Sequence, residues 1–313
     1  MTATKAFLAG FVLLAGLVVL ALSVGAQGFG WGDGGSLLLL RTPRVLAALA
    51  AGLALGVGGA AQQGVFRNPL ADPGLTGVFG GALFGIALLL GFFPEAAWQR
   101  AWCIPAAAFT GALATSALLV VLGGGGGTSR LLLAGLGLNA FTAAGTLVIA
   151  SRSGESRELL TNGAYGDWLG MATLELTWLP VLLTFIAAAL LLTLARSLDL
   201  LSFGEDAARG FGCDVGRVRR NAVLLTALAA AAATCLVGQV AFIGLLAPHL
   251  ARQLVGPRHA KVLPLSALLG AALLLGADTI GRGLWPQAPL SAAAVTAVLG
   301  APLFIWIARG RHE

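Results

Sequence analysis

The chain has 313 residues, of which 58% are hydrophobic and only 10% are charged, and its mean hydropathy is +0.91. An ordinary soluble domain carries about 25% charged residues, so this composition excludes one and predicts a protein that crosses a lipid bilayer several times. The formal charge of +6 does not indicate a nucleic-acid partner, because no basic cluster is interleaved with stacking aromatic residues and basic loops are normal in membrane proteins.

Stretches of about 20 apolar residues, some shortened by Pro or Gly, predict an all-α membrane protein with about ten transmembrane helices. They lie near residues 6–26, 43–64, 74–92, 102–122, 131–150, 174–195, 221–239, 241–255, 263–281 and 289–308. The first stretch is longer than the apolar region of a signal peptide, which has about 7 to 15 residues, so we expect this stretch to span the membrane. No hydrophilic segment is large enough to form its own core, and residues 1–313 are expected to form a single transmembrane domain.

The distribution of basic residues predicts the orientation of these helices. Ten helices put both termini on the same side, and placing them in the cytoplasm assigns thirteen of the 19 Lys and Arg residues to the inside. The positive-inside rule therefore predicts that both termini are cytoplasmic.

Two arginines flank a proline at the outer end of the second predicted helix. These are Arg41 and Arg44, around Pro43, and Arg282 ends the ninth predicted helix on the same side. Guanidinium groups gathered on an outer surface can hold a partner's carboxylates bidentately and steer the partner by long-range attraction. The alternative is that they snorkel to interfacial water, as Arg at helix ends commonly does.

A polar segment separates the second and third predicted helices. Residues 64–85 read GVFRNPLADPGLTGVFGGALFG, and Pro69 and Pro73 keep part of this backbone out of regular helix. Such backbone is tolerated at membrane depth only where protein or water surrounds it, so Asn68, Pro69, Asp72 and Pro73 are candidates for a pathway or gate. Asp72 could equally cap the next helix, because Pro73 suits the first helical position.

A charged segment follows the sixth predicted helix. Within residues 196–220, Ser202 and Glu205 have the spacing of a capping box, which predicts a short helix ending at Gly210 or Gly212. The alternative is an ordinary charged connecting loop.

Neither metal binding nor a cofactor is expected. In the phrase FIGLLAPH at residues 242–249, Pro248 is expected to kink or end a helix, and His249 is an isolated intramembrane His, which usually packs or forms hydrogen bonds. The cysteines have no spacing typical of a metal site or a disulfide framework; they are Cys103, Cys213 and Cys235.

The segments RTPR, FRNPLADPG, GEDAARGFG and FIGLLAPH together closely resemble the FecCD-type permease family. Its members are the membrane subunits of ABC importers for ferric siderophores, haem and cobalamin. The region before the tenth predicted helix departs from the family's E-L-P-x-G-x-x-T pattern, which leaves the geometry before that helix open.

The resemblance implies a role for two of these groups of residues. Arg41, Arg44 and Arg282 would dock a substrate-binding protein. Coupling to an ATPase would fall to the residues that match the family's G-E-x-A-x-x-x-G stretch when the alignment shifts by one place, so that its last Gly is Gly212. These residues are Gly204, Glu205, Ala208, Arg209 and Gly212.

The resemblance also implies a type II ABC importer permease fold in a bacterial inner membrane. The chain would work as a homodimer with two ATP-binding cassette subunits and a periplasmic or lipoprotein substrate-binding protein. It has no Walker motif, so it is not expected to be an enzyme, and a partner would hydrolyse ATP.

We expect the substrate to be an iron chelate, either haem or a ferric siderophore, with cobalamin as the alternative. An ion-driven secondary transporter is less favoured. Its mechanism needs ionisable groups in the membrane, and only Glu175 and Asp278 are carboxylates near predicted spans, each close to an outer end.

Overall fold

Helices form nearly all of the regular structure. The computed structural model describes residues 2–25, 28–30, 36–93, 102–123, 128–151, 168–284 and 290–309. The helices of the first half are α1 (Ala3–Ser23), α2 (Ser36–Phe66), α3 (Val78–Phe92), α5 (Cys103–Gly123) and α6 (Thr128–Ala150). Those of the second half are α8 (Leu174–Thr193), α9 (Ala195–Ser202), α10 (Glu205–Gly210), α11 (Val215–Val237), α12 (Ile243–Val255), α13 (His259–Leu284) and α14 (Ala292–Arg309).

The remaining elements are short. Two 3-10 turns, η2 (Pro73–Thr76) and η3 (Trp168–Met171), precede α3 and α8. Strands β1 (Val24–Gly25) and β2 (Gly28–Phe29) pair antiparallel, with Val24 opposite Phe29. The expected all-α architecture is therefore confirmed apart from this small hairpin.

Seven of the described helices are long and apolar enough to cross a membrane: α1, α2, α5, α6, α8, α11 and α13. Each of the ten predicted stretches overlaps a helix, but α3, α12 and α14 do not meet this criterion, so the number ten stays a prediction. The second predicted helix was placed too short, because α2 begins at Ser36 and contains Pro43 within it.

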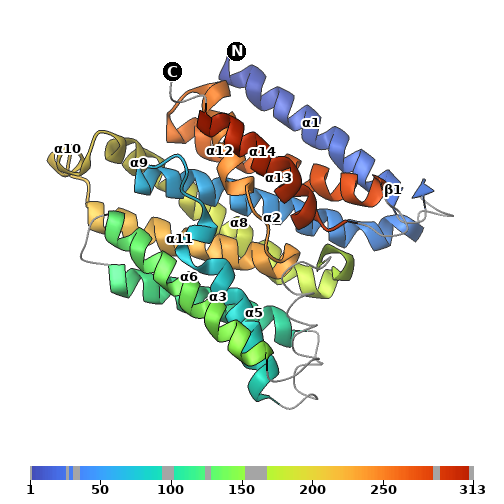
Figure 1. Cartoon of the computed structure of the whole chain (residues 1–313). Coiled ribbons are helices and arrows are strands. Elements are labelled where there is room, and N and C mark those ends of the chain that lie inside the picture. The colour runs from blue at the N-terminus through green and yellow to red at the C-terminus, as the bar shows by residue number, and fades with distance from the viewer. Residues whose placement is uncertain are drawn as a thin grey trace.

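The helices form two groups joined by a central pair. Figure 1 shows α1, α12, α13 and α14 on one side and α3, α5 and α6 on the other, with α2 and α11 between them. In the apolar 18-residue stretch of α2, 83% of the residues are buried, whereas in that of α1 only 22% are buried. Helix α2 is therefore the central element, and α1 lies at the periphery.

Small residues explain why α2 can occupy the centre. Gly52 and Gly56 lie against the backbone of Gly270 and Ser266 on α13, so close that a Cβ atom at either glycine would overlap backbone atoms. Small residues allow this close approach between membrane helices. The two helices therefore form a tightly packed pair through the molecule.

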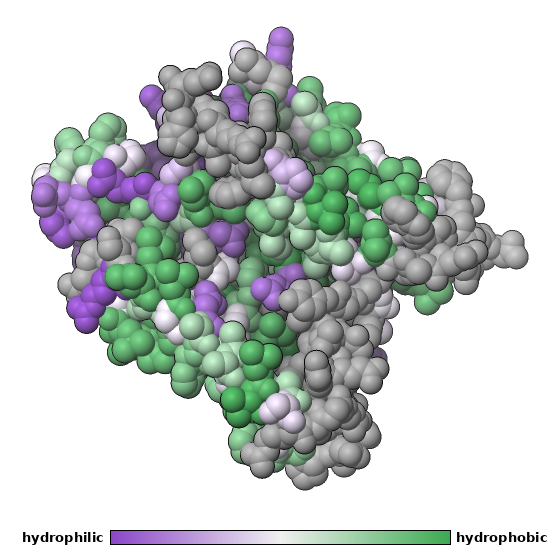
Figure 2. Space-filling view, viewed as in Figure 1, coloured by the Kyte–Doolittle hydropathy of each residue, from purple (hydrophilic) through white to green (hydrophobic). Residues whose placement is uncertain are grey.

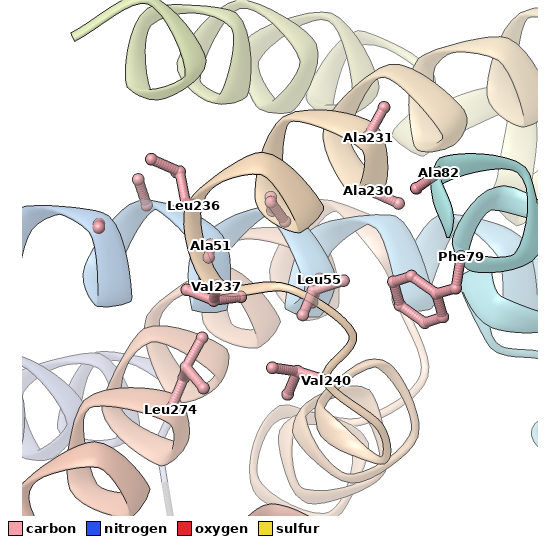
Figure 3. Packing of buried hydrophobic residues seen from close by; sticks show 14 of the residues in the cluster. Ala51, Leu55, Phe79, Ala82, Ala230, Ala231, Leu236, Val237, Val240 and Leu274 are labelled. Carbon is pink, nitrogen blue, oxygen red and sulfur yellow. The ribbon is translucent and has the colours of Figure 1, made fainter. Parts of the chain in front are cut away.

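The apolar core lies where α2 meets α3, α11 and α13. Figure 3 shows Ala51 and Leu55 of α2 facing Leu274, Val237 and neighbouring side chains. Large apolar residues also cover the outside, for example Leu8, Phe11 and Val12 of α1 at 64%, 61% and 65% exposure. This exposed apolar surface is what a bilayer would cover.

Candidate functional site

The polar segment after α2 begins with an unusual backbone conformation. Arg67 has φ 48, in the left-handed region, and the side chain of Asn68 accepts a hydrogen bond from the N–H of Leu70 at 2.9 Å. Asp72 Oδ1 accepts from the N–H of Gly74 at 2.8 Å, with Pro73 at the first position of η2. The predicted capping role of Asp72 is confirmed.

Buried amide side chains hold this segment inside the bundle. Gln62 Nε2 donates to Thr76 Oγ1 at 3.2 Å, and Asn139 Nδ2 on α6 donates to the carbonyl of Gly74 at 3.1 Å. Gln63 Nε2 donates across to the carbonyl of Gly244 on α12 at 3.1 Å. Protein groups thus satisfy part of the irregular backbone, as membrane depth requires.

Sequence reasoning missed Gln62 and Gln63. They are 1% and 3% exposed, and two adjacent amides inside an otherwise apolar helix were the available signal. Whether Asn68, Pro69, Asp72 and Pro73 line a pathway stays a prediction.

The carboxyl group of Asp72 is chemically distinctive within this segment. Burial raises its pKa from 3.8 to about 6, although the hydrogen bond from Gly74 acts in the opposite direction. Its Oδ2 lies close to Gly244 at the start of α12, where an added Cβ would come within 2.8 Å. Near neutral pH this group is therefore closer to its protonation midpoint than an ordinary aspartate.

The three predicted docking arginines converge at one end of the α2–α13 pair, which we call the arginine end. Asp278 of α13, fully buried, accepts from Arg44 Nη2 at 2.7 Å and Nε at 3.0 Å through Oδ1. Its Oδ2 accepts from Arg282 Nε at 3.0 Å. One carboxylate therefore binds two guanidinium groups.

Arg41 and Arg282 also fasten the end of α1 to this cluster. Arg41 Nη1 donates to the carbonyls of Leu22 at 2.7 Å and Gly30 at 2.6 Å, and Arg282 Nη1 donates to Val24 at 2.7 Å. At 7% and 5% exposure, Arg41 and Arg282 do not extend their charged groups into water, so the snorkelling alternative is wrong for these two residues. Sequence reasoning located Asp278 but missed its pairing with Arg44 and Arg282.

The opposite end of the bundle carries the predicted coupling residues. Helix α10 projects from it, at the left of Figure 1, and Figure 2 shows hydrophilic side chains gathered there. Arg209 bonds to Glu205 Oε2 at 3.2 Å and to Asp206 Oδ1 at 3.0 Å, and Glu205 Oε1 also contacts Arg219 of α11. Ala208 is fully buried and anchors α10 against its neighbours.

The helix prediction for this segment is confirmed, but the capping box is wrong. The N-cap of α10 is Gly204, with φ 110 and no side-chain cap, and Ser202 Oγ donates instead to the carbonyl of Asp199 at 2.6 Å. The helix ends at Gly210, and Gly212 takes the left-handed φ of 79 that ends it.

Two aromatic side chains flank α10, and the sequence analysis did not single them out. Phe203 is 74% exposed and Phe211 is 72% exposed, one at each end of the helix. They stand at the polar end of the molecule, so bilayer contact does not readily account for them, and exposed aromatics are typical of protein interfaces.

The predicted FIGLLAPH segment forms most of α12. Pro248 lies within the helix and does not end it, and the chain turns before it at Phe242, which has φ 69. His249 Nε2 lies 3.0 Å from Gln253 Nε2. Across the described part of the chain, no group of three or more His, Cys, Asp or Glu side chains lies close enough to hold a metal ion.

Apolar helices around irregular polar backbone, with a charged projection at one end, define a multi-pass membrane protein built for transport. The chain belongs to the FecCD transport family, whose family model matches residues 10–310. This confirms the resemblance carried by the four sequence motifs.

Curated relatives of the chain are import permeases. It is 40% identical over 275 residues to the ferric enterobactin transport system permease protein FepD of Escherichia coli (strain K12), covering 86% of this chain and 80% of the relative. It is 39% identical over 280 residues to the vitamin B12 import system permease protein BtuC of Vibrio cholerae, covering 88% and 82%.

A solved structure supports the same assignment. It is an inward-facing conformation of a transporter assigned to the metal-chelate type of ABC transporters, with a TM-score of 0.89 and 27% sequence identity. The match covers 98% of this chain and 99% of that chain.

Proposed function

We propose that this chain is the membrane-spanning permease subunit of an ABC importer that carries an iron chelate, either a ferric siderophore or haem, across a bacterial inner membrane. The observation that carries the proposal is the family match over residues 10–310. The similarity to a ferric enterobactin permease and to a metal-chelate transporter supports the substrate class.

Cobalamin is the second candidate substrate. The vitamin B12 permease of Vibrio cholerae is 39% identical to the chain, against 40% for the ferric enterobactin permease, so overall identity does not separate the two. An ion-driven mechanism finds less support, because the carboxylate of Asp278 is occupied by two guanidinium groups.

The proposed topology is ten spans with both termini in the cytoplasm, α10 on the cytoplasmic side and the arginine end outside. The chain would pair with a second copy of itself and with two ATP-binding cassette subunits. Helix α10, with Phe203 and Phe211 beside it, suits contact with the ATPase because it projects and combines exposed aromatics with charge.

The arginine end would receive the substrate-binding protein. Arg44 and Arg282 both bind the carboxylate of Asp278 there, and Arg41 lies near them. A partner's acidic groups would be attracted to a surface where guanidinium groups gather. Because Arg41 and Arg282 are buried, we assign the first contact to Arg44, whose side chain is 12% exposed.

The substrate assignment is tested by uptake into proteoliposomes. The chain, co-purified with its ATP-binding cassette subunit and supplied with its binding protein, should accumulate a radiolabelled ferric siderophore or haem when ATP is present. Accumulation of cobalamin alone would establish the second candidate. Uptake driven by an ion gradient without ATP would contradict the importer proposal.

Docking is tested through association kinetics. The association rate of the binding protein should fall several-fold as ionic strength rises from about 0.05 to 0.5 M, and Arg44→Gln should weaken that salt dependence. Lys5→Gln, at the other end of the chain's first helix, is the matched control. Equal salt dependence in all three proteins would remove Arg44 from the docking surface.

A further inference from the structure

A pocket of about 610 Å³ lies at the α10 end of the molecule, beside the base of the projecting segment. Its walls come from the end of α2, the start of the RNPLADP segment, the end of α9 and the junction between α12 and α13. None of the coupling residues assigned above lines it.

The charge of this pocket is strongly unbalanced. Three guanidinium groups line it, those of Arg67, Arg252 and Arg258, against the single carboxylate of Asp199. Arg252 contacts the neutral Gln63 Oε1, and in the part of the chain that the structure describes Arg67 and Arg258 form no ion pair. The pocket therefore attracts an anion.

The carboxylate of Asp199 is already committed to another group. Its Oδ1 accepts from the backbone N–H of His259 at 2.8 Å and lies 2.7 Å from His259 Nδ1. This contact joins α9 to the first residue of α13 and holds the imidazole in place. Asp199 is the single carboxylate of the described lining, and it faces the two positive charges of Arg67 and Arg258.

The other ring nitrogen of His259 is buried without a partner. His259 is 5% exposed, and within the described ranges its Nε2 has no hydrogen-bond partner. Nε2 faces Gly64, where a Cβ would lie only 2.6 Å away, and both residues line the pocket. Because Nδ1–H donates to Asp199, Nε2 is a hydrogen-bond acceptor, which suits a hydroxyl group of a ligand and not a phosphate oxygen.

The backbone conformation of Arg67 also indicates a ligand site. Arg67 has φ 48, which residues other than glycine seldom adopt, and such conformations cluster at ligand-binding sites. The pocket also adjoins the N-terminus of α13, a 26-residue helix whose dipole favours negative charge there.

We propose that this pocket binds a phosphate group, and that its source is the head group of an anionic phospholipid. Arginine suits phosphate oxygens because its planar fork can donate two parallel hydrogen bonds. Pro69, Pro257 and Phe203 add apolar wall beside the arginines, which suits a head group with an attached acyl chain better than a free ion. Basic pockets between membrane helices on the cytoplasmic side are known to hold such head groups. Only the choice of leaflet rests on the proposed topology.

The test uses the purified, delipidated full-length chain in detergent, without ATPase or transport substrate, so that its outcome is independent of the importer function. Native mass spectrometry measures binding of phosphatidylglycerol and of zwitterionic phosphatidylcholine, and calorimetry measures binding of inorganic phosphate. The variant is Arg67→Gln with Arg258→Gln, two exposed side chains whose loss should leave the fold intact. The control is Arg220→Gln, an exposed arginine of α11 at the same end but outside the pocket.

We expect the wild type to prefer phosphatidylglycerol, and the double variant to lose affinity for it by about tenfold or more, while Arg220→Gln changes it less than about twofold. Phosphate binding that disappears in the double variant, without a lipid preference, would keep the phosphate site and overturn the lipid as its source. Equal binding in all three proteins, or equal losses in the double variant and Arg220→Gln, would overturn the site.

Discussion

The ion pairs at the two ends of the α2–α13 pair differ in burial. At the arginine end, Arg44 and Arg282 are drawn inward around the fully buried Asp278, and backbone carbonyls take up further donors. At the α10 end, Arg209 is 58% exposed and Asp206 is 99% exposed, and their contacts are within one short helix. The first end uses charge to hold helices together. The second also joins elements through Glu205–Arg219 and Asp199–His259, but it leaves further charge exposed on the projecting α10.

This difference predicts different energetic consequences for similar ion pairs. Removing one partner of a buried pair leaves an uncompensated charge, which typically destabilises a protein by about 3 to 5 kcal/mol. An exposed pair contributes about 0 to 1 kcal/mol. Stability should therefore depend mainly on the arginine end, and association with the ATP-binding cassette subunit should depend on the α10 end.

Asp278→Asn should have the largest effect on stability. The amide cannot neutralise Arg44 and Arg282, so we expect a loss of about 3 kcal/mol or more. Asp206→Asn at the other end is the control and should leave stability unchanged, because its carboxylate is 99% exposed. Thermal unfolding in detergent measures both, and a similar loss in the two variants would break the contrast between the ends.

Among the residues that the structure describes, no guanidinium group pairs with the carboxylate of Asp72, and this carboxylate should respond to pH. The folded-state pKa of Asp72, about 6, lies above the ordinary 3.8. Protonated Asp72 therefore stabilises the folded state relative to the unfolded state below about pH 4, and this contribution is lost as the pH rises through 6. The shift corresponds to at most about 3 kcal/mol. Asp72→Asn retains an oxygen to cap Gly74 and removes the titration.

The measurement is the difference in unfolding temperature between wild type and Asp72→Asn from pH 4 to pH 7.5. The variant should gain stability relative to the wild type as pH rises. Asp72→Ala, which also loses the hydrogen bond to Gly74, should be less stable than Asp72→Asn at every pH. A difference that does not change with pH would contradict the raised pKa.

Phe203→Ala with Phe211→Ala should weaken association with the ATP-binding cassette subunit by about tenfold or more. Truncating an aromatic residue that is central to an interface often costs about 2 kcal/mol of binding free energy. The fold should be unaffected, since both rings are more than 70% exposed. Phe11→Ala, an exposed Phe on α1, is the control. Co-purification yield and titrated binding measure the effect, and losses as large in the control would remove these rings from the interface.

A small effect on stability is expected when the charges of α10 are exchanged. Glu205→Arg with Arg209→Glu retains an i,i+4 pair but sets the new guanidinium against Arg219, so we expect a loss of about 1 kcal/mol. The exchanged charges should nevertheless reduce the number of substrate molecules imported per ATP hydrolysed. Unchanged assembly and an unchanged ratio would exclude Glu205 and Arg209 from energy coupling.

The capping arrangements show how far local sequence reasoning reaches. Asp72 caps η2 as predicted, because the acceptor, Pro73 and the donor of Gly74 lie within three consecutive residues. Ser202 and Glu205 have an equally suggestive spacing, yet the Ser202 hydroxyl bonds back to the carbonyl of Asp199. Gly204 then begins α10 with φ 110, a conformation that the spacing alone does not specify.

The sequence by itself determined the class of protein, the approximate position of most helices and the family, because these depend on composition, on lengths of apolar segments and on contiguous motifs. It also singled out Arg41, Arg44 and Arg282. Only the tertiary structure decided that Asp278 pairs with Arg44, 234 residues away, and that Gln63 reaches Gly244. Contacts at such separations depend on how α2 packs against α12 and α13, which no local pattern encodes.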